Sequence, residues 1–192
     1  MRVRVRALSA SDVITVAGLP VTAGAQTWVD LAATLPDGEL VAVGDALWRA
    51  GHLDDAALRH RLTRAEGRRG VRRARRWAPR LTPAAASRPE SLLRVHLVEG
   101  DVPDPDVQVP VHDARGREVA HADLGYGRWR VAVEYEGRQH AEARQFRRDL
   151  ERYTLITADG WLLLRFGDVH LDRPAVVVDR VARALRSRGA RW

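Results

Sequence analysis

Residues 122–140 read ADLGYGRWRVAVEYEGRQH, and this stretch decides the fold that the sequence predicts. It brings Asp123, Glu134, Glu136 and His140 within 18 positions of one another. Several carboxylates together with one imidazole suit a hard divalent cation that activates water. The cluster therefore predicts a nuclease site, with Mg²⁺ or Mn²⁺ as the cofactor and Asp123, Glu134 and Glu136 as the candidate metal ligands.

The alternation of apolar and polar residues places the three carboxylates on two adjacent strands. In the strand expected over residues 129–135, the valines lie on one face, and Glu134 lies on the other together with Glu136 just beyond the strand. Asp123 ends the preceding strand, and a tight turn at 125–128 makes the pair antiparallel. The sequence does not fix the register, so either glutamate could lie nearer to Asp123. The alternative is that these carboxylates form the solvated face of an amphipathic hairpin.

The elements around this hairpin follow the order α-β-β-β-α-β-α, which predicts an α/β fold with a restriction-endonuclease-like core. The assignment rests on helical and strand periodicity with turn residues between the segments. We expect helices at 87–98, 140–156 and 173–188, and strands at 107–111, 117–124, 129–135 and 161–166.

Residues 1–80 predict a separate, mainly helical N-terminal domain after a short β start. Apolar residues recur at helical spacing over 25–35, 38–50 and 54–62. A stretch rich in Ala, Pro and Ser over 81–88 is the expected linker. The second domain is expected to span 87–192.

The end of the N-terminal domain is strongly basic, with an Arg-rich segment over 68–80. On a helix expected over 67–80, Arg68, Arg72, Arg75 and Arg76 would share one face. We expect these side chains to contact DNA phosphates. The alternative is an ordinary solvated helix face.

The composition of the 192 residues narrows the class of protein. The formal net charge is +7, all of the basic residues are arginine, and cysteine is absent. Disulfides and cysteine-bound zinc are thereby excluded, and a nucleic-acid partner is plausible. The alternating MRVRVR opening lacks the apolar core of a signal peptide, and no segment is apolar enough for a membrane helix. We expect a cytoplasmic protein with no membrane partner.

Glu90 has two interpretations. In the sequence SRPE over 87–90, Ser87 fits the N-cap of a helix and Glu90 fits the residue that closes a capping box. Pro89 in the first turn favours a helix start here. A capping glutamate can also belong to a site, so both roles stay open.

Taken together, these motifs resemble the Vsr-like endonucleases, named for very-short-patch repair, within the PD-(D/E)xK nuclease superfamily. The resemblance covers 87–188 and rests on Glu90, ADL at 122–124, VEYEG at 133–137, RRDLER at 147–152 and DGW at 159–161. It implies a site made of Glu90, Asp123, a position near Glu136, His140 and Asp149. The stretch GLPVTAGAQTWVDLAATL at 18–35 is similar to a region of AbiEi-type antitoxin-like regulators. No winged helix is readable ahead of it.

The sequence departs from the superfamily pattern at one important position. Glu136 stands where the (D/E)xK lysine is expected after Glu134. The Vsr-like enzymes also lack this lysine and use histidine chemistry, so the resemblance still implies activity, although mismatch specificity is not carried over.

The expected function is a metal-dependent DNA endonuclease that hydrolyses phosphodiester bonds. His140 would act as general acid or base, Glu90 and Asp149 would orient it or the metal's waters, and the phosphate backbone would meet Arg144, Arg147 and Arg148. The alternative is a non-catalytic DNA-binding or antitoxin-like regulator that keeps the nuclease fold.

Overall fold

The computed structural model describes residues 8–113, 115–137, 154 and 156–192. The chain divides into two compact units, Met1–Pro83 and Ala84–Trp192. Each unit has its own buried residues and is described by itself. No helix in the described ranges has the length and hydropathy needed to cross a bilayer.

The first unit is mainly helical. A short 3₁₀ turn (η1, Ala10–Asp12) leads into an antiparallel hairpin, β1 (Val13–Val16) and β2 (Leu19–Thr22). Four helices follow, α1 (Gly24–Leu31), α2 (Asp37–Arg49), α3 (Asp55–Thr63) and α4 (Val71–Trp77), and a second 3₁₀ turn ends the series (η2, Ala78–Arg80). Trp28 and Trp77 are completely buried in this unit. The Trp28 indole N–H donates to the Leu40 carbonyl at 2.8 Å, which satisfies its polar group in the core.

The basic helix of this unit is shorter than its sequence predicts. Gly70 has φ +84° and is the N-cap of α4, so the helix begins only at Val71. A glycine in this left-handed conformation interrupts a continuous helix, because φ is negative throughout an α-helix. Arg68 therefore precedes α4 and does not continue its helical face.

An ion pair connects the buried Asp12 of η1 to Arg64, the residue just after α3. Asp12 is 3% exposed, and its two carboxylate oxygens accept from the Arg64 guanidinium at 2.6 and 3.1 Å. The backbone N–H and hydroxyl of Ser9 donate to the same carboxylate. The Arg64 hydrogen bonds, supported by those from Ser9, hold the pKa of Asp12 well below its ordinary value, although burial opposes the shift.

We expect Asp12→Asn to lower the free energy of unfolding by about 1.5–3 kcal/mol at neutral pH, the range for hydrogen bonds to a charged group. A depressed pKa in the folded state stabilises above the unfolded-state pKa of about 3.9, and this stabilisation is lost as pH falls toward the folded-state pKa. Urea unfolding at pH 7 and pH 3 should therefore show a smaller gap between wild type and variant at pH 3. Asp55→Asn is the matched control, because Asp55 forms an exposed i,i+4 pair with Arg59. A gap of the same size at both pH values would contradict this account.

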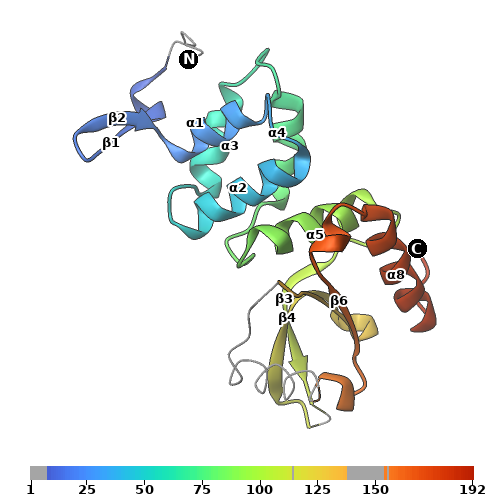
Figure 1. Ribbon diagram of the computed structural model, residues 1–192. Coiled ribbons are helices and arrows are strands. Elements are labelled where there is room, and N and C mark those ends of the chain that lie inside the picture. The colour runs from blue at the N-terminus through green and yellow to red at the C-terminus, as the bar shows by residue number, and fades with distance from the viewer. Residues whose placement is uncertain (1–7, 114, 138–153, 155) are drawn as a thin grey trace. The chain divides into compact units, whose positions relative to one another are not determined.

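The second unit is a mixed four-stranded sheet with helices, seen in Figure 1 below the label of α5. Helix α5 (Arg88–Glu99) is followed by β3 (Asp106–His112), β4 (Glu118–Tyr126), a 3₁₀ turn (η3, Gly127–Trp129) and β5 (Val131–Tyr135). Then come β6 (Leu162–Phe166), α7 (Asp168–Leu171) and α8 (Pro174–Ser187). The strand order is β3-β4-β5-β6; the first two pairings are antiparallel, and β5 and β6 are parallel.

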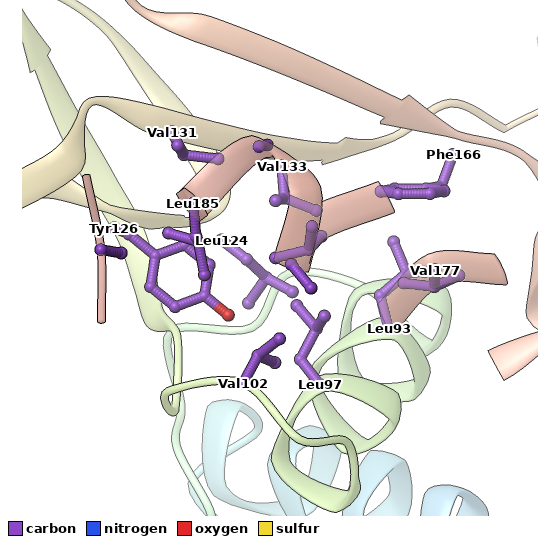
Figure 2. Packing of buried hydrophobic residues seen from close by; sticks show 14 residues of the cluster. Leu93, Leu97, Val102, Leu124, Tyr126, Val131, Val133, Phe166, Val177 and Leu185 are labelled. Atoms are coloured by element: carbon purple, nitrogen blue, oxygen red, sulfur yellow. The ribbon is translucent and has the colours of Figure 1, made fainter. Parts of the chain in front are cut away.

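The main core of this unit lies between the sheet and the helix pair α5 and α8. Leu93 and Leu97 of α5 pack with Val133 of β5, and Val177 and Leu185 of α8 join the same cluster (Figure 2). A second cluster contains Val109, Ala122, Ala132, Ile156 and Trp161. Val133 and Ala132 are neighbours in β5 and therefore point to opposite faces, so both faces of the sheet bury apolar side chains.

The sequence predicts most of the described elements of the second unit with small shifts at their ends. The strand expected to end at 124 continues to Tyr126, so the chain reverses at 127–130, where Arg130 has φ +51°. The short helix α7 was not expected. The helix predicted over 140–156 falls almost entirely outside the described residues.

Candidate functional site

The register of β4 and β5 brings Asp123 and Glu134 to the same place in the sheet. Gly125 pairs with Ala132 and Leu124 with Val133, so Asp123 and Glu134 are the residues just beyond the end of the ladder on the two strands. Of the two glutamates, Glu134 is therefore the one next to the last paired residues of β4 and β5, as Asp123 is on its own strand.

A hydrogen bond from the backbone fixes the Asp123 side chain at this point. The Tyr135 N–H donates to Asp123 Oδ2 at 2.9 Å, while the ladder pairing of β4 with β5 ends at Leu124 and Val133. The carboxylate therefore takes the place that a strand carbonyl would occupy in a continued ladder. A carboxylate held by a backbone donor is oriented by the sheet itself.

The side chains of β4 stop alternating regularly between the two faces of the sheet at Asp123. Leu124 packs in the core beside α5 and α8, whereas Ala122, two residues earlier, belongs to the second cluster. In a regular strand these two side chains would share one face. The partner strand behaves alike: Val107 packs against the first core and Val109 in the second, with Gln108 between them at φ +52°. Such irregularities re-aim side chains and recur near active sites.

Glu134 is 2% exposed. Its partner in the parallel ladder is Arg165 of β6. A carboxylate this deeply buried keeps its charge only beside a cation or strong donors. Together, Asp123 and Glu134 form what we name the carboxylate pair.

Glu136 lies beyond the end of β5 and has a different setting. Its backbone N–H donates to the Phe166 carbonyl at 2.7 Å, and its carboxylate forms an ion pair with Arg165. Its side chain is 54% exposed. The expected third metal ligand is thus paired with an arginine that the sequence analysis did not single out.

Glu90 acts as a cap of α5. Its Oε1 accepts from the Ser87 hydroxyl at 2.7 Å, and its Oε2 accepts from the Ala86 N–H at 2.8 Å. The Glu90 N–H lies 3.4 Å from Ser87 Oγ, which caps the helix. The capping interpretation is confirmed, and both carboxylate oxygens are used in it.

Among the described residues, no group of three or more His, Cys, Asp or Glu side chains could hold a metal ion. Mg²⁺ keeps several waters and is commonly bound through only one or two carboxylates, so the carboxylate pair fits its demands. His140 and Asp149 lie outside the described residues, as do Arg144, Arg147 and Arg148.

The ends of β5 and β6 make several contacts that the sequence analysis missed. The Tyr135 hydroxyl donates to Asp168 at the start of α7. The His170 imidazole accepts from the Gly167 N–H through Nδ1 and lies edge-on to Phe166. These groups follow β6 directly in the chain, and only the parallel pairing of β5 with β6 reveals that they lie near Tyr135.

The four arginines predicted to bind DNA differ in their contacts and in their exposure. Arg76 forms an ion pair with Asp37 at 3.3 Å and lies over the Trp77 ring. Arg75 donates to the Leu62 carbonyl at 3.4 Å. Arg72 is exposed, and Arg68 is half-buried. Arg72 is therefore the member of the set best placed to meet a phosphate.

Replacing Arg68, Arg72, Arg75 and Arg76 with glutamine should flatten the salt dependence of DNA binding. Each lost phosphate contact should reduce the slope of log K against log salt by up to about 0.9. Binding isotherms at several salt concentrations measure this slope, and Arg59→Gln is the matched control because Arg59 already pairs with Asp55. An unchanged slope would mean that these arginines are solvated surface.

Two similar proteins of Mycobacterium tuberculosis, both described as uncharacterized, are Rv2248 and MT2308. Each is 30% identical to this chain over 173 residues. The chain is homologous to both. The alignment covers 88% of this chain and 63% of each relative, so the chain spans less than two thirds of their length. No protein-family model matches the chain, and no solved structure matches it.

Proposed function

We propose that the second unit is a metal-dependent DNA endonuclease with the restriction-endonuclease-like fold of the Vsr-like proteins. One observation carries the proposal: Asp123 and the buried Glu134 lie next to Leu124 and Val133, the pair at which the ladder of β4 and β5 ends. The strand order supports it, because an antiparallel β3-β4-β5 meander followed by a parallel β6 is the arrangement expected for that core. The carboxylate pair gives the fold a plausible reaction centre.

Each residue has a role in this proposal. The carboxylate pair would hold Mg²⁺ or Mn²⁺, and the bound ion supplies polarisation of the scissile phosphate and a more acidic water. The Tyr135 N–H donates to Asp123 Oδ2 and so orients its carboxylate. His140 is the proposed general acid or base, and Asp149 its orienting partner. Arg144, Arg147 and Arg148 are proposed to meet the DNA backbone.

The contacts of two residues modify the roles that the resemblance implies. Both carboxylate oxygens of Glu90 accept hydrogen bonds at the N-terminus of α5, so its proposed role is to position that helix against the sheet. Glu136 stands at the lysine position of the superfamily and pairs with Arg165. We propose that Arg165 supplies the positive charge on this side of the carboxylate pair.

A plasmid-nicking assay with and without Mg²⁺ or Mn²⁺ tests the proposal. The expected result is conversion of supercoiled plasmid to open-circle or linear DNA only when the metal is present. A folded protein that binds DNA and cuts no substrate with either metal would favour the non-catalytic regulator.

A further inference from the structure

The hairpin of β1 and β2 carries an apolar face that the first unit leaves open. The strand register pairs Ile14 with Val21 and Val16 with Leu19. Paired residues of antiparallel strands lie on one face of the sheet, and so do residues two apart in a strand. These four side chains therefore share a face, and each is between 40% and 66% exposed. They make up most of the large hydrophobic side chains that are exposed in the described part of the chain.

The hairpin has little support from the rest of its unit. Figure 1 shows the two strands extending away from the helices α1 to α4 of the same unit. At its base, the Ala23 N–H donates to the Asp12 carbonyl at 2.8 Å, but every residue over 14–22 is exposed. A two-stranded hairpin is at best marginally stable in water unless its apolar face packs against another element. We therefore expect a further surface to cover this face.

The turn between the two strands holds the face in one shape. Ala17 has φ +50° and Gly18 has φ +77°, so both central residues of the turn are left-handed. Two such residues in succession are typical of the tight hairpin turns whose twist matches that of the strands. A surface that is already formed loses less conformational entropy when it binds a partner.

The absence of charge around the hairpin indicates the kind of partner. Residues 13–29 contain no charged side chain, although 30% of the residues in the chain are charged. Nucleic acids are bound mainly through basic side chains that contact phosphate, so they do not suit this face. A polar protein surface would lose its hydrogen bonds to water and gain none from aliphatic side chains. The face suits another apolar sheet face.

A second copy of the chain supplies such a face. In a two-fold dimer the same patch of both copies meets, so the patch must be complementary to itself. Uncharged aliphatic side chains meet this condition, because they need no matching donor, acceptor or opposite charge. The contact also keeps charged groups out of the interface between two copies of a chain with a formal net charge of +7.

We propose that the face formed by Ile14, Val16, Leu19 and Val21 is a homodimer contact, in which two hairpins pack face to face about a two-fold axis. Stable complexes use about 20–30 residues from each partner, so four aliphatic residues predict a weak dimer that forms as the concentration rises. The proposal concerns the first unit alone and does not depend on the proposed nuclease function.

Sedimentation equilibrium of the full chain without DNA tests the proposal. The average mass should rise toward twice that of one chain as the concentration increases through the micromolar range to about 1 mM. Added salt should strengthen the association, because it screens the repulsion between two positively charged copies and the contact itself is uncharged. The mass of one chain at every concentration, or an association that salt weakens, would overturn the proposal.

Leu19→Glu is the decisive variant. It should weaken the association at least tenfold, because a carboxylate from each copy would be buried in an apolar contact. Thr15→Glu is the matched control: it adds the same charge to the same hairpin, but Thr15 is an exposed residue of the opposite face. It should associate like the wild type. If Leu19→Glu also associates like the wild type, the interface lies elsewhere and the proposal is wrong.

Mixing Leu19→Glu with Leu19→Arg identifies the second copy as the partner. Each variant alone should be monomeric, and the mixture should associate, because opposite charges then meet within one small contact. Recovery in the mixture also shows that both variants fold. A mixture that stays monomeric would exclude the two-fold contact. A monomeric wild type with a higher Tm than Leu19→Glu would mean that the chain itself covers the face, and this result would also exclude the dimer.

Discussion

Replacing Asp123 with asparagine should reduce metal-dependent cleavage by about a thousandfold or more. Loss of a metal ligand removes several kcal/mol of charge stabilisation from the transition state, and each 1.36 kcal/mol is about tenfold in rate. The fold should survive, because the asparagine amide oxygen can still accept the Tyr135 N–H. DNA affinity without metal should stay equal or rise, since a negative charge near phosphate is gone.

Single-turnover cleavage rates and DNA-binding curves measure the two effects of Asp123→Asn. Asp172→Asn is the control, because Asp172 is exposed and lies just beyond α7. A variant that cuts at the wild-type rate would remove Asp123 from the site. If wild type and Asp123→Asn both bind DNA equally and neither cuts, the regulator becomes the better account.

The second large effect is a rise in thermal stability on metal binding, which can be measured without an activity assay. Ligand binding to the folded state alone stabilises it by about 2.7 kcal/mol at 100 times Kd. For a domain of this size that corresponds to a rise in Tm of about 10 °C on addition of Mg²⁺. Glu134→Gln should abolish this rise, because an amide is a much poorer ligand for a hard cation than a carboxylate.

Thermal unfolding of wild type and Glu134→Gln with EDTA or saturating Mg²⁺ gives the comparison. Glu66→Gln, an exposed glutamate of the first unit, should keep the full rise. A wild-type Tm that does not respond to Mg²⁺ or Mn²⁺ would show that the carboxylate pair binds neither ion. A rise of equal size in Glu134→Gln would place the ion elsewhere.

Local periodicity was enough to predict most described helices and strands of the second unit. The alternating valines of β5 and the amphipathic pattern of α8 each indicate, from the sequence alone, which face of the element is buried. The α5 cap was also predictable, because Ser87 and Glu90 lie three residues apart and interact within one turn. These features depend on neighbours in the chain.

The features that the sequence did not predict depend on residues far apart in the chain. The choice of Glu134 over Glu136 as the neighbour of Asp123 follows from the strand register, which the turn at 127–130 sets. The Glu136–Arg165 pair follows from the parallel alignment of β5 and β6. Gln108 gave no local signal, since a glutamine rarely adopts positive φ.

The bend in β3 also has a consequence for how the protein behaves at high concentration. Strand β3 is the end strand of the described sheet, and an open end strand can recruit another chain through its backbone groups. Pro110 offers no N–H, Gln108 turns the backbone out of line, and the register shifts again between Val111 and His112. These three backbone irregularities within the seven residues of β3 leave no regular stretch with which a strand of another molecule could pair. We conclude that the irregular backbone around Gln108 also protects this strand against aggregation.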